Sequence, residues 1–316
     1  MKYPNMNKYK LLPILFIFLF AFINTSSINA QNNNEPAHDV ASNDQTARYY
    51  YVKTKDNTKF TGKIVYHNRA ESEIIFQLYD GGYEVTVLTS NILSMRRVKS
   101  NDVRNGEYLF PDISGGRYLV TPNGIGLKKG DFQYRTSNLL YHSLSYGVTN
   151  YLSVHAGGEL YTSISLQQPA YNLGVNLHFP ITSTLHFGTN LSFANVYGDY
   201  QNMANAYAYI TAGNRNHNFS IGYGYGYPTL MNDFQKAKQF IPLSMKFRMG
   251  KNLALITENW LVPDLNSGIS ESYYSYGVRM LWEGFSLDLA FVNNIAFIDE
   301  FILGIPMINF VYAIKK

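Results

Sequence analysis

Arg279 and Asp288 are the two residues whose spacing points most directly to a shared chemical role. Glu283-Gly284 lies between them and suits a two-residue hairpin turn, because glycine accepts a positive φ. In the register that this turn sets, Arg279 lies directly across from Asp288. Such a cross-strand pair stabilises a sheet by about 0.2–1 kcal/mol. Facing a pore, the same pair would form a charged constriction that selects solutes. The sequence leaves both roles open.

Histidines and carboxylates on one strand could also bind a metal ion. His155 and Glu159 are four residues apart, which corresponds to about 13 Å along an extended strand. They cannot ligate one ion without side chains from other strands. The chain also has no phosphate-binding glycine loop, EF-hand loop or zinc-protease motif. We therefore expect no metal site and no cofactor.

Lipid hydrolysis is a second chemistry that the sequence raises. His142 shares a strand face with Leu140 and Leu144, whereas Ser143 and Ser145 point the other way. A serine nucleophile needs its base within hydrogen-bond reach. Neither serine is poised for His142 on that strand, so we expect no catalytic residue and no enzyme. A lipid-active hydrolase based on His142 stays open as an alternative.

Composition excludes several further kinds of site. The 316-residue chain has no cysteine, which excludes disulfides, thiolate zinc sites, cysteine nucleophiles and an acylated lipoprotein anchor. The net charge is only +4, so we expect no nucleic-acid partner. Charged residues make up 15% of the chain and aromatic residues 16%. The charged share is well below the usual ~25%, which favours a protein with a large apolar surface.

Strands with strict alternation must position these side chains. In residues 285–291 the odd positions are large and apolar and the even positions are small or polar, and residues 171–179 and 219–227 show the same pattern. Repeated segments of about ten residues with this period and many aromatics are typical of a transmembrane β-barrel. A soluble β-sandwich or internal barrel also alternates. However, bulky residues on one face and Gly, Asn and Ser on the other are inside-out for a soluble barrel.

Connection lengths give an independent test of the barrel. Short connections alternate with longer ones; the short ones are residues 148–150, 180–183, 214–216, 249–251 and 283–284, and the long ones are 123–130, 162–169, 197–202, 228–238, 262–270 and 293–304. The alternation requires residues 117–122 to be the first strand, and the count is then twelve. Short turns lie in the periplasm in outer-membrane barrels. The predicted fold is therefore all-β, with an antiparallel barrel of about 12 strands over residues 117–316 and both of its ends in the periplasm.

The pattern over residues 117–316 resembles the outer-membrane β-barrel proteins of Gram-negative bacteria, in a porin-like form. This resemblance implies an outer-membrane location with lipid around the barrel. Alternation assigns a set of charged and histidine side chains to the inward, lumen-lining face: Arg279, Asp288, Glu258, Glu159, His155, His178, His186, Lys246 and Arg248.

The N-terminus has the layout of a secretory signal peptide. Basic residues precede an apolar run at residues 11–23, and small and polar residues follow up to Ala30. The apolar run is shorter than the ~20 residues that a spanning helix needs. We predict a signal peptide over residues 1–30 and a flexible leader over residues 31–46.

Residues 47–98 carry five short strand patterns in a small β domain. A Phe-x-Gly-x-Ile pattern occupies residues 60–64, a hairpin turn residues 80–82, and an Ile-x-x-Met strand residues 92–95. The segment resembles SH3-like and Sm-like small barrels. RNA binding is not expected, since an exported domain meets little RNA. We expect a periplasmic adaptor or plug-like domain, followed by a linker over residues 99–116.

These features predict an outer-membrane barrel that acts as a narrow channel or a solute-binding barrel. Its expected partners are membrane lipid, a small solute and a periplasmic protein. One alternative is a structural envelope protein that uses the periplasmic domain to dock a partner. The lipid-active outer-membrane hydrolase is the other.

Overall fold

The computed structural model describes residues 49–68, 70–79, 81–160, 170–196, 201–226, 237–263, 272–294 and 303–314 of the chain. The predicted signal peptide, the leader and most of the predicted long loops lie outside these residues. The described part of the chain is built from strands and short turns. It contains no helix that is long and apolar enough to cross a membrane.

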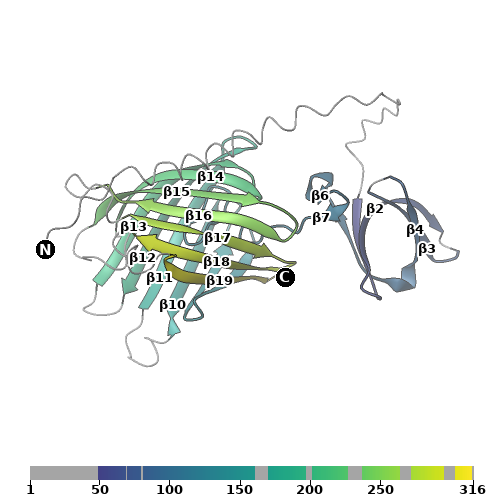
Figure 1. Ribbon diagram of the computed structural model, residues 1–316, viewed down its shortest axis with the longest axis horizontal. Coiled ribbons are helices and arrows are strands. Elements are labelled where there is room, and N and C mark those ends of the chain that lie inside the picture. The colour runs from purple at the N-terminus through teal and green to yellow at the C-terminus, as the bar shows by residue number, and fades with distance from the viewer. Residues whose placement is uncertain are drawn as a thin grey trace. The chain divides into compact units, whose positions relative to one another are not determined.

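Twelve strands pair into one closed antiparallel barrel (Figure 1). They are β8 (Phe132–Ser137), β9 (Tyr141–Gly147), β10 (Leu152–Glu159), β11 (Ala170–Pro180), β12 (Leu185–Val196), β13 (Gln201–Gly213), β14 (His217–Gly226), β15 (Lys238–Arg248), β16 (Leu253–Leu261), β17 (Tyr273–Leu281), β18 (Phe285–Asn294) and β19 (Ile305–Ile314). β19 pairs with β8, so the barrel leaves no unpaired strand edge. The predicted all-β fold with a twelve-stranded antiparallel barrel is confirmed.

Alternation along the strands sorts the side chains between the two faces of the barrel. Leu191 on β12 is 60% exposed, whereas its neighbour Asn190 is 4% exposed. Outward residues such as Leu173, Ile210 and Ile221 are also large, apolar and exposed. A band of outward apolar side chains is what a barrel presents to lipid.

The first barrel strand is not where the loop lengths predicted it. Residues 117–122 join no barrel strand, and Arg117 and Pro122 form an isolated bridge instead. Residues 131–147, which the predicted connections at 123–130 and 148–150 leave as a single strand, are folded into β8 and β9. Asn138 (φ 49°) and Leu139 (φ 63°) turn the chain between them. One predicted strand is therefore absent and one unpredicted strand is present, which leaves the count at twelve.

The connections distinguish the two ends of the barrel. The turns between β9 and β10, β11 and β12, β13 and β14, β15 and β16, and β17 and β18 lie at one end, which we call the turn end. The chain also enters β8 and leaves β19 there. The opposite end, the loop end, carries the tight turn between β8 and β9. This turn is an exception to the predicted alternation of short and long connections.

Residues 49–98 form a separate five-stranded antiparallel sheet in the order β4-β3-β2-β1-β5. Its strands are β1 (Tyr49–Thr54), β2 (Lys59–Asn68), β3 (Glu73–Leu78), β4 (Glu84–Leu88) and β5 (Ile92–Val98). Val52, Ile74, Phe76 and Val87 form its buried core. A hairpin of β6 (Val103–Arg104) and β7 (Glu107–Tyr108) follows the sheet. The SH3-like or Sm-like resemblance and the domain boundaries stay predictions.

Candidate functional site

Residues 112–127, which we call the plug, lie inside the barrel lumen. The plug is a hairpin in which the Tyr118 N–H donates to Thr121 O (2.8 Å) and the Asn123 N–H donates to Gly116 O (2.9 Å). Gly126 has a left-handed φ of 55°, and a Cβ added there would lie 2.3 Å from the His178 ring. Only glycine fits at this position. The plug enters from the turn end, reaches its apex at residues 119–120, and returns to the turn end before β8.

Asp112 anchors the beginning of the plug to the barrel wall. Its carboxylate is 1% exposed, and its Oδ2 lies 2.6 Å from Lys246 Nζ and 3.5 Å from Arg279 Nη1. The Ser114 N–H donates to its Oδ1 at 2.9 Å. A buried charge costs several kcal/mol unless it is paired and hydrogen-bonded. Two buried cations and a backbone donor meet this need for Asp112.

Arg279 joins the wall to the plug. Its Nε and Nη2 donate to the two carboxylate oxygens of Asp288, at 2.6 and 3.0 Å. The remaining donors bond the plug carbonyls of Ser114 (3.0 Å), Arg117 (3.2 Å) and Tyr118 (3.0 Å). Arg279 lies directly opposite Asp288 in the β17–β18 ladder. The ion pair therefore holds the plug in place in this structure.

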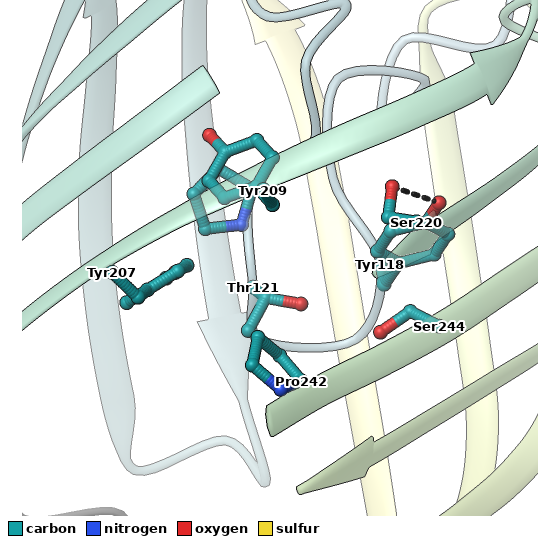
Figure 2. A pocket seen from close by; sticks show the side chains of 8 residues that line it. Tyr118, Thr121, Tyr207, Tyr209, Ser220, Pro242 and Ser244 are labelled. Atoms are coloured by element: carbon teal, nitrogen blue, oxygen red, sulfur yellow. Dashed lines mark hydrogen bonds between the residues drawn. The ribbon is translucent and has the colours of Figure 1, made fainter. Parts of the chain in front are cut away.

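Glu258, in the middle of β16, holds the apex. Its carboxylate accepts the backbone N–H groups of Val120 (2.8 Å) and Thr121 (3.0 Å). It also accepts the indole N–H of Trp260 at 2.8 Å. Below the apex, Tyr118 Oη and Ser220 Oγ are 2.7 Å apart (Figure 2).

The plug packs closely against the wall on this side. Figure 2 shows the cavity between the plug residues Tyr118 and Thr121 and the wall residues Tyr207, Tyr209 and Pro242. Its volume is about 10 Å³. This is about the space of one water molecule.

The returning leg of the plug is bound by other strands. The Gly124 N–H donates to Thr211 Oγ1 on β13 at 2.9 Å. His178 Nε2 lies 3.0 Å from Leu127 O, and Arg215 Nη2 donates to Gly126 O at 3.0 Å. Polar side chains of the wall thus contact the plug along its whole length, and Tyr118 and Leu119 also pack against Ile256 and Ala290 of the wall.

Two other predicted lumen residues lie at the margin of the plug. Arg248, near the turn end, donates to Phe110 O at 2.7 Å. The Cβ of His186 lies 2.9 Å from the position that a Cβ on Gly124 would take, so His186 lies directly against the returning leg.

His155 and Glu159 face the lumen from β10 and are not brought together. His155 Nδ1 is 3.4 Å from Asn176 Nδ2 on β11. Glu159 lies at the loop end of β10, opposite Tyr141 on β9.

The geometry around His142 does not form a nucleophile–base pair with the adjacent serine. His142 Nδ1 lies 2.5 Å from Tyr134 Oη. Ser143 is buried on the opposite face of the strand. Within the residues that the structure describes, no group of three His, Asp or Glu side chains could hold a metal ion. The described site binds a segment of the chain itself.

The sequence interpretation missed Asp112, the other plug residues and Arg135. Two signals could have revealed them. Residues 131–147 are too long for one spanning strand, which needs about 9–11 residues. Residues 117–122 are too short for one, and turn-forming glycines flank them at 115–116 and 124.

Comparisons with known proteins find structures with a similar barrel. No protein-family model and no curated protein matches this chain. A structure titled "KdgM porin in complex with disordered oligogalacturonate" has a TM-score of 0.38 and 9% identity, covering 58% of this chain and 95% of that one. The NanC porin has a TM-score of 0.39 and 8% identity, covering 59% of this chain and 99% of that one. CdiB from Acinetobacter baumannii has a TM-score of 0.25 and 12% identity, covering 58% of this chain and 46% of that one. The fold assignment rests on the strand pairing of the barrel itself.

Proposed function

We propose that this protein is an outer-membrane channel for small solutes, which its own plug holds closed at rest. The observation that carries the proposal is the docking of residues 112–127 onto a polar wall. Buried plug residues such as Tyr118, Leu119 and Asn123 fill the lumen where a solute would pass.

The chemistry of the wall favours a plug that can move. A permanent filling needs only apolar side chains, and buried ion pairs are seldom more stable than apolar packing of the same volume. Here the wall holds the plug with charged residues such as Lys246, Glu258 and Arg279, and with Ser220 and Thr211. If the plug leaves, these side chains remain as a hydrophilic, water-wettable surface.

Barrel size supports the same proposal. Eight-stranded barrels are filled by their own side chains, and barrels of about 16–18 strands leave an open channel. Twelve strands enclose a lumen that this chain fills with a hairpin. A displaced hairpin would leave a narrow path for solutes.

The outward apolar side chains support an outer-membrane location for the barrel. Short turns of such barrels face the periplasm. The turn end would therefore be periplasmic, and so would the small sheet of residues 49–98 that precedes the plug.

Replacing Glu258 by glutamine tests the channel. The change removes the negative charge that binds the two apex N–H groups, and charge-assisted hydrogen bonds contribute about 1.5–3 kcal/mol each. A net loss of about 2 kcal/mol corresponds to a roughly 30-fold rise in open probability. Single-channel recording in planar lipid bilayers measures it. The matched control is Glu84→Gln on β4, which carries the same charge change on an exposed residue of the small sheet.

A docking role for the small sheet is the second candidate function. Its surface exposes large apolar side chains, including Tyr83 (72%), Tyr66 (57%) and Leu93 (56%). If the Glu258→Gln barrel does not conduct although its plug apex is undocked, the channel proposal is excluded and this structural role is favoured.

A further inference from the structure

Two arginines of the lumen differ from the other buried cations in their partners. Arg135 on β8 is 6% exposed and donates from Nη2 to Asn309 Oδ1 at 3.2 Å. Arg117 in the plug donates from Nη2 to Val120 O at 2.7 Å. The Nε atom of each is buried and has no hydrogen-bond partner in the part of the chain that the structure describes. Neither arginine forms an ion pair with a described carboxylate.

The buried charges of the lumen do not balance. The buried cations are Arg135, Lys246, Arg248 and Arg279, and the buried carboxylates are Asp112, Glu258 and Asp288. Among the partly buried residues, Arg117 adds a fifth cation and Glu159, at the loop end of β10, adds a fourth carboxylate.

The three carboxylates are already engaged elsewhere. Asp112 and Asp288 pair with Lys246 and Arg279, and Glu258 binds the N–H groups of the apex. Asn309 links Arg135 to the plug next to Arg117: its Oδ1 accepts from Arg135 Nη2 at 3.2 Å, and its Nδ2 donates to Leu119 O at 3.2 Å, two residues beyond Arg117. Buried guanidinium groups with unused donors need a compensating anion. Arg248 also lacks a carboxylate partner, but carbonyl groups and the Asn216 amide accept from its Nε, Nη1 and Nη2. Arg117 and Arg135 are therefore the lumen arginines whose Nε donors are unused among the described residues.

Other polar groups surround this pair. Ser137 Oγ is buried without a hydrogen-bond partner among the described residues. It lies two residues after Arg135, on the same face of β8, which is about 6.5 Å along the strand. Tyr141 Oη and the His155 ring lie over inward glycines of the neighbouring strands, so both side chains extend across the lumen wall. The hydroxyl groups and the imidazole ring can bond a ligand that carries hydroxyl groups.

The site faces the solvent-accessible side of the apex. Val120, at the apex, is 48% exposed, although its neighbours Tyr118 and Leu119 are each 1% exposed. Inward residues of β11 such as Asn172 and Asn176 keep partial exposure, whereas His178, nearer the turn end, is buried. A solute that enters from the loop end would meet Arg117 and Arg135 before it meets the rest of the plug.

We infer that Arg117 and Arg135 form a binding site for the oxyanion of a small hydroxylated solute, a carboxylate or a phosphate, at the loop-end side of the plug apex. This inference rests on the proposed function, because it names the class of solute that the channel takes. One guanidinium comes from the plug and the other from the wall. The oxyanion would accept the free Nε–H groups of both and cancel their repulsion.

Calorimetric titration of the folded, detergent-solubilised full chain tests the site, with sodium glucuronate, inorganic phosphate and glucose as probes in low-salt buffer. We expect glucuronate or phosphate to bind and glucose, which lacks the oxyanion, not to bind. Arg135→Gln should weaken anion binding at least tenfold, and so should Arg117→Gln. Arg135→Lys keeps the charge and should retain part of the affinity. The matched control is Lys129→Gln, an equal loss of charge at an exposed residue of the turn end.

The probes separate the two oxyanions. Binding of glucuronate alone would define a carboxylate site, and binding of phosphate alone a phosphate site. Failure of both to bind the wild-type chain would overturn the inference, as would equal affinity in the wild-type chain and in both glutamine variants. Binding needs the two guanidinium groups to turn toward the solute, because their Nε atoms are buried, but it does not need the plug to open. Anion binding by a barrel that never conducts would therefore reject the channel and leave the site standing.

Discussion

Replacing Arg279 by methionine should lower the free energy of unfolding by about 3–5 kcal/mol, which is the usual cost of removing one partner from a buried ion pair. Arg279 is fully buried and binds the carboxylate of Asp288 and three carbonyls of the plug. Methionine fills much of the volume but leaves Asp288 as an uncompensated buried charge. Equilibrium unfolding in urea, followed by the heat-modifiable band shift of the folded barrel on a gel, measures the change.

Two companion variants make this result specific. Arg97→Met removes the same side chain from an exposed position on β5 and should change stability by less than about 0.5 kcal/mol. Arg279→Met combined with Asp288→Leu removes both charges and should recover part of the loss. A loss below about 1 kcal/mol for Arg279→Met alone would show that the ion pair does not support the fold.

Replacing Asp112 by alanine should raise the open probability of the channel more than any other single change in the plug. It leaves Lys246, which is 1% exposed, without its partner at 2.6 Å. An uncompensated buried charge costs about 3 kcal/mol or more, so we expect a rise in open probability of roughly 100-fold. Planar-bilayer recording measures the opening. The fluorescence of Trp260 reports whether the plug is docked, because its indole N–H bonds Glu258 beside the apex. The chain has only two tryptophans, so the change Trp282→Phe leaves Trp260 as the single fluorescent indole.

The rescue variant distinguishes the ion pair from a general loss of packing. Asp112→Ala combined with Lys246→Met removes both charges, and such replacements are often close to neutral. The open probability of the double variant should therefore be nearly as low as that of the wild type. If it conducts as often as Asp112→Ala alone, the Asp112–Lys246 pair is not what holds the plug.

The strands and their faces could be read from the sequence because they depend on local alternation. Each strand of a barrel places every second side chain outward, so residues such as Leu191 and Asn190 reveal their faces without knowledge of their neighbours. The pairing of Arg279 with Asp288 followed in the same way from the tight turn at Glu283-Gly284. Local rules of turn geometry and period were sufficient for both.

The plug could not be read in that way. The run of Tyr118, Leu119 and Val120 has the composition of a strand, and alternation cannot separate a hairpin in the lumen from a strand in the wall. What distinguishes it is its set of partners, such as Ser220 and Glu258, which lie more than a hundred residues away in the chain. Such long-range polar pairing leaves no periodic trace in the sequence. The inward charges were identifiable, but the segment that they bind was not.

A reversible lock on the plug tests whether the plug closes the channel. Ser114 Oγ in the plug and Ser286 Oγ on β18 are 2.8 Å apart, and the chain has no cysteine of its own. Ser114→Cys combined with Ser286→Cys therefore offers one defined disulfide between the plug and the wall. It is introduced into the Asp112→Ala background, with each single-cysteine variant as a control, and conductance is recorded before and after addition of dithiothreitol. If the plug closes the channel, the barrel should be silent in the oxidised state and should open frequently after reduction, with no such change in the controls. Equal conductance in the oxidised and reduced states would contradict closure by the plug.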